Sequence, residues 1–257
     1  MQTVENISTE DLQSYVFRLA DNALILGQQV SAWCGHAPAL EEDIAFANVA
    51  LDLIGQATNW LNYAAELDAK DVTADDLAFL RDKEAFRNSL LVEQPNADFG
   101  ASLMRQFLFD SYHYFLLNEL VKSTNSRIAE IAAKSVKEVT YHLERTSDLI
   151  IRLGDGSKES HQYMQRALDA LWGFTAELTT ADDLDKKMHK AGIGADLNSL
   201  SKNVSTHMKE VFSRANLTPP QTQEMLSGGK SGRHSDYMGE LLDEMQSLRR
   251  NHPNASW

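Results

Sequence analysis

The sequence predicts an all-α protein in which a four-helix bundle is followed by further helices at the C-terminal end. Apolar residues recur at three- and four-residue steps over long stretches, which is the pattern of helices that bury one face. Helix-breaking residues are few, with 5 prolines and 13 glycines among 257 residues. We expect one domain over residues 1–257, with the core bundle at about 9–153 and a helical extension at about 158–257.

The first two helices are expected to form an antiparallel hairpin. The first helix should begin near Thr9, a suitable N-cap, and continue to about Trp33. Residues 34–38 contain a glycine and a proline and should end it. The second helix should cover about 40–67, because apolar residues recur there at helical spacing: Ile44, Ala47, Leu51, Ile54, Ala57 and Leu61.

A long connection is expected between this hairpin and the next. Residues 68–98 are acidic and are interrupted by Pro95, so they should hold only a short helix near 73–81. A connection of this length is sufficient to cross a helical bundle, as some four-helix topologies require.

A second hairpin should follow, with helices at about 98–123 and 126–153 joined by a turn at residues 124–125. Gly154 and Gly156 should end its second helix. The extension should contain four more helices, at about residues 160–178, 181–190, 195–214 and 237–251.

The charge balance argues against several kinds of partner. With 37 acidic and 24 basic residues the formal net charge is −13, which disfavours binding to nucleic acid or to anionic membranes. No apolar run approaches the length of a membrane span, and the acidic N-terminus does not resemble a signal peptide. The single cysteine, Cys34, cannot form an intramolecular disulfide and fits a reducing compartment. We therefore expect a cytoplasmic protein.

Acidic residues are placed on the two hairpins as they are in bundles that hold two metal ions. Because both helices of a hairpin rise by about 1.5 Å per residue, residues equidistant from the turn lie at similar depth. By this measure Asp52 lies opposite Asp21, and Glu138 lies opposite Asp110 or Ser111. Four carboxylates on four helices at one level predict a bundle of the ferritin-like type.

The histidines of such a site are missing from their expected positions. Di-iron bundles carry Glu-x-x-His on two of their helices. Here Gly55 follows Asp52 by three residues and Tyr141 follows Glu138 by three, and neither is a suitable neutral-pH ligand. Two other histidines share these helices, His113 after Asp110 and His142 after Glu138. The six candidates for a vestigial metal site are therefore Asp21, Asp52, Asp110, His113, Glu138 and His142.

A plainer interpretation is that the acidic residues are solvated and the two histidines are hydrogen-bonded core residues. Apolar neighbours favour burial instead. Asp52 is flanked by Leu51, Leu53 and Ile54, and Asp110 by aromatic residues. Buried carboxylates without a metal require another cation. The candidate internal counter-ions are Arg18, Arg105, Lys137 and Arg145.

A glycine-rich segment at residues 228–232 lacks the spacing of a phosphate-binding loop. Lys230, Arg233 and His234 lie close together in this segment and are candidates for contact with a partner or an anion. A flexible loop without such a role is the alternative interpretation.

Several segments resemble one known family. They are Trp33-Cys34-Gly35-His36-Ala37-Pro38, Leu51-Asp52-Leu53-Ile54-Gly55-Gln56-Ala57, Leu91-Val92-Glu93-Gln94-Pro95-Asn96, Lys137-Glu138 with Tyr141-His142-Leu143, Leu171-Trp172 with Phe174-Thr175-Ala176-Glu177-Leu178, Gly228-Gly229-Lys230 with Gly232 and His234, and Glu244-Met245-Gln246 with Leu248. Together they make the chain similar to the family of C-type subunits of bacterial phenylacetyl-CoA epoxidases, the ring-1,2 monooxygenases.

The resemblance implies a ferritin-like, noncatalytic structural subunit with no catalytic residue, metal or other cofactor of its own. It implies pairing with the homologous A-type subunit, which is catalytic and holds di-iron, together with other subunits of the complex. There a reductase supplies NADPH electrons, and the catalytic di-iron subunit inserts oxygen into the ring of phenylacetyl-CoA during aerobic phenylacetate degradation.

Two other functions compete with this interpretation. One is an active di-metal enzyme that uses the four carboxylates with His113 or His142 in a displaced geometry. The other is a helical assembly protein unrelated to oxygenation. An apolar partner-facing surface would make the isolated chain self-associate.

Overall fold

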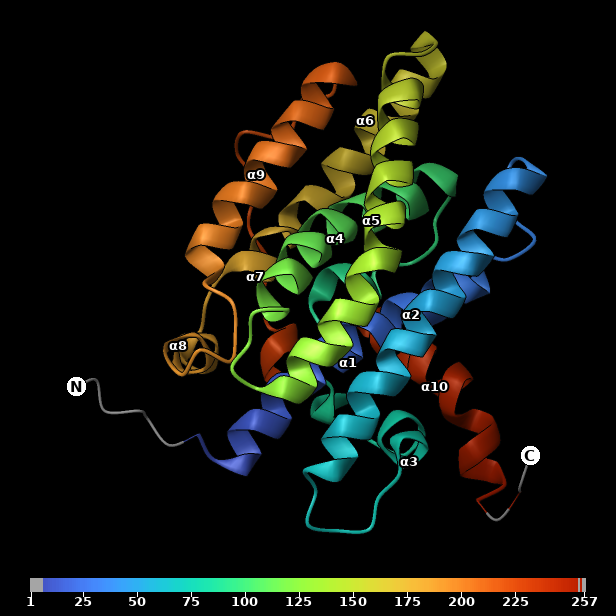
Figure 1. Cartoon of the computed structure of the whole chain (residues 1–257). Coiled ribbons are helices and arrows are strands. Elements are labelled where there is room, and N and C mark those ends of the chain that lie inside the picture. The colour runs from blue at the N-terminus through green and yellow to red at the C-terminus, as the bar shows by residue number, and fades with distance from the viewer. Residues whose placement is uncertain (1–6, 254, 256–257) are drawn as a thin grey trace. The chain divides into compact units, whose positions relative to one another are not determined.

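The computed structural model describes residues 7–253 and residue 255, which form helices and turns with no strand (Figure 1). The predicted all-α, ferritin-like fold class is confirmed. The α-helices of this described part are α1 (Thr9–Ala32), α2 (Leu40–Glu66), α3 (Ala74–Phe79), α4 (Phe99–Leu120), α5 (Ser126–Gly154), α6 (Lys158–Leu171), α7 (Ala176–Thr179), α8 (Asp183–Lys190), α9 (Leu197–Arg214) and α10 (Asp236–Asn251). Within it, no helix is both long and apolar enough to span a membrane.

The chain divides into two compact units, each containing one of the predicted hairpins. The hairpin-1 unit comprises Ser8–Pro95 and the segment that begins at Gly228, and the hairpin-2 unit comprises Asn96–Ser227 together with Ile7. The C-terminal extension is thus divided between the two units. The expectation of a single domain stays a prediction.

In the hairpin-1 unit, α1 and α2 pack along their lengths as the predicted antiparallel pair (Figure 1). The N-cap of α1 is Ser8, whose side chain accepts a hydrogen bond from the Asp11 N–H, so the prediction of Thr9 was wrong by one residue. Large apolar side chains fill the interior of the unit, among them Ile25, Phe46, Leu53, Trp60 and Phe86. Helix α10 packs against α3 and α1, which ties the C-terminal segment to the first hairpin.

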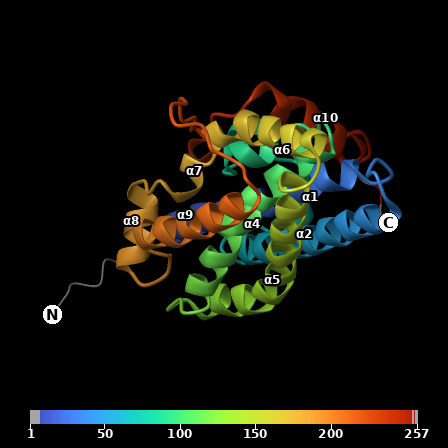
Figure 2. The same cartoon turned by 90° about the horizontal axis from the view of Figure 1, so that it is seen from above.

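In the hairpin-2 unit, α4 packs against α5 and is also contacted by α6 and α9 (Figure 2). Helix α4 is buried on most of its surface, including Arg105, Gln106 and Asp110. Its polar side chains must therefore find partners inside the protein.

The helix predicted over residues 160–178 is interrupted. Helix α6 ends at Leu171, a 3₁₀ turn covers Trp172–Phe174, and the short α7 follows. The Gly173 carbonyl accepts a hydrogen bond from the Leu226 N–H, and a Cβ at Gly173 would lie 2.9 Å from the Glu224 carbonyl oxygen. The segment around residue 224 therefore passes directly over Gly173, which explains why the helix breaks there.

Candidate functional site

Asp21 is fully buried on α1 and is bound by an arginine. Its Oδ2 accepts hydrogen bonds from Arg81 Nη1 at 3.0 Å and from the Arg87 backbone N–H at 2.8 Å. Its Oδ1 accepts a further bond from Arg81 Nη2. The Arg81 guanidinium also lies over the rings of Phe17 and Phe86, 4.4 and 4.2 Å from their centroids. Both oxygens of this candidate metal ligand are thus occupied by donors from the protein.

Asp52 and Gly55 lie toward the outside of α2. Asp52 is half-buried and Gly55 is exposed, with no atom within 4 Å of an added Cβ. Of the apolar neighbours expected to bury Asp52, Leu53 is buried, whereas Leu51 is 71% exposed. The position that would carry the first histidine ligand therefore faces away from the unit's core.

Asp110, on α4, is fully buried among uncharged donors. It accepts hydrogen bonds from Gln106 Nε2 at 2.7 Å and from Thr146 Oγ1 at 3.1 Å. Burial raises the pKa of its carboxyl to about 6, although the nearby His142 opposes this increase. The carboxyl is therefore held by neutral hydrogen-bonding groups and titrates well above the usual range of an aspartate.

His113 is buried one turn from Asp110, with its ring centroid 4.9 Å from that of Phe109. Burial, and then the proximity of His142, lower the pKa of His113 to about 3. The imidazole is therefore neutral at physiological pH. Asp110, His113 and His142 are the predicted residues that the structure brings together in the hairpin-2 unit.

Helix α5 exposes Tyr141 and buries the adjacent His142. His142 is buried with Val139 and Thr146, whereas Tyr141 is 52% exposed and Glu138 is half-buried. The second position expected to carry a histidine ligand thus also faces outward. In the described part of the chain, no three His, Cys, Asp or Glu side chains are placed so that they could hold a metal ion. These residues do not fit a di-metal site.

The four predicted internal counter-ions differ in burial, and one of them is exposed. Lys137 is exposed, which contradicts an internal role, whereas Arg105 is buried and donates from Nη2 to Asn96 Oδ1 at 2.6 Å. Arg18 is buried and Arg145 is half-buried. Arg81 was not predicted from the sequence, because this residue lies in the long connection, where helix depth cannot be read from spacing.

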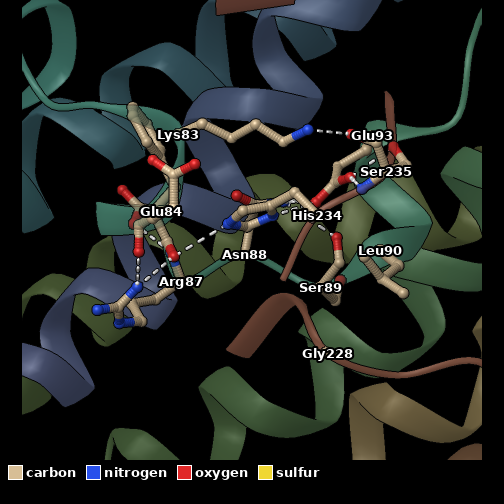
Figure 3. Close-up of polar contacts among 12 residues, drawn as sticks. Lys83, Glu84, Arg87, Asn88, Ser89, Leu90, Glu93, Gly228, His234 and Ser235 are labelled. Atoms are coloured by element: carbon tan, nitrogen blue, oxygen red, sulfur yellow. Dashed lines mark hydrogen bonds and ion pairs between the residues drawn. The ribbon is translucent and has the colours of Figure 1, made fainter. Parts of the chain in front are cut away.

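A second buried ion pair joins two segments of the hairpin-1 unit that are far apart in sequence. Glu93 is fully buried and accepts hydrogen bonds from His234 Nδ1, from the Ser235 N–H at 2.8 Å and from Asn88 Nδ2 at 2.9 Å (Figure 3). His234 Nε2 also faces the Phe86 carbonyl oxygen at 3.1 Å. Both ring nitrogens of His234 thus face oxygen atoms of the same unit.

The glycine-rich segment is a packed turn in this structure. A Cβ at Gly229 would lie 2.1 Å from the Asn88 carbonyl oxygen, and one at Gly232 would lie 2.4 Å from that of Glu84. Only residues without a side chain allow this approach. His234 is therefore an internal partner of Glu93 and is unavailable to an external anion. Contact of Lys230 and Arg233 with a partner or an anion stays a prediction.

The Asp21–Arg81 pair is expected to dominate the stability of the hairpin-1 unit. Replacing Arg81 by Met leaves a buried carboxylate without its cation, so it should lower the free energy of unfolding by about 3–5 kcal/mol. The double variant Asp21→Asn/Arg81→Met should recover part of that loss, as measured by urea unfolding. The exposed pair Arg152–Asp148 is the control, and Arg152→Met should cost less than about 1 kcal/mol. Equal losses at the two arginines would contradict this assignment.

The two titrating groups of the hairpin-2 unit should give opposite pH dependences. Between about pH 3 and 6.5 the unfolded chain binds a proton at His113 that the folded chain does not, so this group makes stability rise with pH. Between about pH 4 and 6 the folded chain retains a proton at Asp110 that the unfolded chain loses, so this group makes stability fall with pH. Each slope is at most about 1.4 kcal/mol per pH unit.

Unfolding free energies of His113→Asn and Asp110→Asn across pH 4–6 test this assignment. Relative to wild type, His113→Asn should lose stability as pH rises, and Asp110→Asn should gain it. The exposed residue His36 provides the control for replacing an imidazole, through His36→Asn measured over the same pH range. Curves for the two buried variants that run parallel to wild type would refute the assigned burial.

Comparison with known proteins identifies the family of this chain. The model of the family described as phenylacetic acid catabolic protein matches residues 1–257. The chain is 44% identical over 246 residues to the C subunit of the 1,2-phenylacetyl-CoA epoxidase of Escherichia coli (strain K12), and the match covers 96% of this chain and 99% of that protein. The chain therefore belongs to the family of phenylacetic acid catabolic proteins.

Proposed function

We propose that this chain is a noncatalytic structural subunit of a phenylacetyl-CoA epoxidase complex in aerobic phenylacetate catabolism. It pairs with the homologous catalytic subunit that holds di-iron, and it acts in the cytoplasm with the other subunits of the complex. The E. coli relative is named as the C subunit of such an epoxidase, and its similarity extends over almost the whole chain.

The observation that carries the noncatalytic role is the bonding of Asp21. Arg81 and the Arg87 N–H use both oxygens of the carboxylate, so a protein cation occupies the place that an iron ion bound to Asp21 would need. The outward direction of Gly55 and the exposure of Tyr141 support the same conclusion. Oxygen activation is accordingly assigned to the partner.

An exposed apolar stripe on α2 supports the pairing. Leu40, Ile44 and Leu51 are 71%, 53% and 71% exposed, and the half-buried Ala47 and Ile54 continue the stripe. The steps of four, three, four and three residues are those of a seam that packs against a second helix. An apolar stripe of this kind marks an interaction surface. A helix of the homologous catalytic subunit is the occupant we assign to it.

Substitution of the remaining ligand candidates tests the noncatalytic role. In the reconstituted complex, Asp52→Ala/Glu138→Ala should leave kcat within about twofold of wild type, because neither residue contacts the reacting atoms in this proposal. Epoxidation of phenylacetyl-CoA is measured at equal amounts of assembled complex. A large loss of kcat in a folded, fully assembled complex would restore the di-metal enzyme as the better interpretation.

Charged substitutions on α2 test the pairing. Ile44→Glu/Leu51→Glu should weaken capture of the catalytic subunit at least tenfold, because each carboxylate would be buried without a cation at the interface. Leu248→Glu is the matched control, since Leu248 is 54% exposed on α10 and lies outside the stripe. Co-purification and titration of the two subunits give the affinities. Unchanged capture by the α2 variant would place the partner elsewhere, and stable self-assembly without any partner would favour an assembly protein.

A further inference from the structure

The hairpin-2 unit contains a groove whose lining does not include the buried residues Asp110, His113 and His142. Its volume is about 950 Å³, near the upper end of the range of small-molecule sites. Residues of α7, of α9 and of the segment that follows α9 form its walls, so the whole groove lies within one unit. Its apolar lining includes Trp172, Val204, Met208, Phe212 and Met225.

The floor of this groove is suited to an apolar or aromatic group. Phe212 and Val204 are buried, and the Trp172 ring meets Phe212 edge to face with centroids 6.2 Å apart. Met225, which is exposed, forms part of the opposite wall. Its segment is fixed to the unit by hydrogen bonds, from Leu226 N–H to the Gly173 carbonyl at 2.8 Å and from Gln223 Nε2 to the Asp169 carbonyl at 3.2 Å. The groove is thus a built feature of the unit.

The charged side chains that line the groove are all cationic. Lys186, Lys202 and Lys209 line it, and none of its described lining residues is acidic. This is unexpected by composition, because the chain carries 37 acidic residues against 24 basic ones. Lys202 and Lys209 are two turns apart on one face of α9, and Lys186 approaches from α8 with Asp183 at 3.1 Å. Exposed ammonium groups placed in this way bind phosphate as point charges.

We propose that this groove binds a coenzyme A thioester, with its acyl or aryl group on the apolar floor and its phosphates at Lys202 and Lys209. The charge of Lys186 is already offset by Asp183. Two cations match a multiply charged phosphate group better than the single charge of a fatty or aromatic acid. The net charge of −13 disfavours a nucleic acid as the ligand. The choice of thioester rests on the proposed function, whose substrate belongs to this class. The noncatalytic subunit would then hold substrate as well as support its partner.

Calorimetric titration of the isolated chain with phenylacetyl-CoA tests this proposal. Lys202→Glu/Lys209→Glu should weaken binding at least tenfold. Lys134→Glu/Lys137→Glu is the matched control, because it makes the same charge change at two exposed lysines on α5 outside the groove, and it should bind as wild type does. Free coenzyme A should bind more weakly than the thioester, because it leaves the apolar floor uncovered.

Three results would overturn the proposal: no binding by wild type, equal losses in the two lysine pairs, or equal affinity for coenzyme A and the thioester. Capture of the catalytic subunit by the same Lys202→Glu/Lys209→Glu variant separates this proposal from the proposed function. Intact capture together with any of these three results removes the groove site and leaves the structural role in place. Circular dichroism confirms that each variant is folded.

Discussion

A carboxylate that stays ionised when it is buried needs a partner inside the protein, and this constraint organises the hairpin-1 unit. Asp21 is bound by Arg81, and Glu93 is bound by His234, with all four side chains removed from solvent or nearly so. The first pair holds the connection after α3 against α1. The second holds the segment before α10 against the turn at residues 90–93. Removing either member of such a pair leaves an isolated charge in a medium of low dielectric constant, which is far more costly than losing a surface pair. Both pairs therefore bind segments distant in sequence into one unit.

The hairpin-2 unit satisfies its buried polar groups in another way. Asp110 receives hydrogen bonds from Gln106 and Thr146, and burial shifts its pKa toward neutrality. His113 loses its charge to burial. The two units thus treat their buried carboxylates differently: one balances Asp21 with arginine, and the other reduces the charge of Asp110 itself. Neither solution leaves the carboxylates free to bridge two metal ions.

The sequence predicted much of the fold because helices have a short, regular period. Helix α2 was expected at about 40–67 and covers Leu40–Glu66, and the glycines after the second hairpin gave a comparable limit for the end of α5. The distance of a residue from the turn predicts its height in a hairpin. It predicts the direction of the side chain around the helix axis less accurately. This is why Gly55 and Tyr141 were placed inside and are exposed. Arg81 and the Glu93–His234 pair could not be predicted, because they depend on where irregular segments return to the helices.

The location of iron in the assembled complex tests the noncatalytic role most directly. The chain would be co-expressed with its catalytic partner, the complex isolated, and iron measured in the complex and in each of its members after separation. We predict that iron stays with the partner, while Asp21 in this chain remains bound to Arg81. Near-stoichiometric iron in this chain alone would contradict that role, because the carboxylate would then have to exchange its arginine for a metal ion.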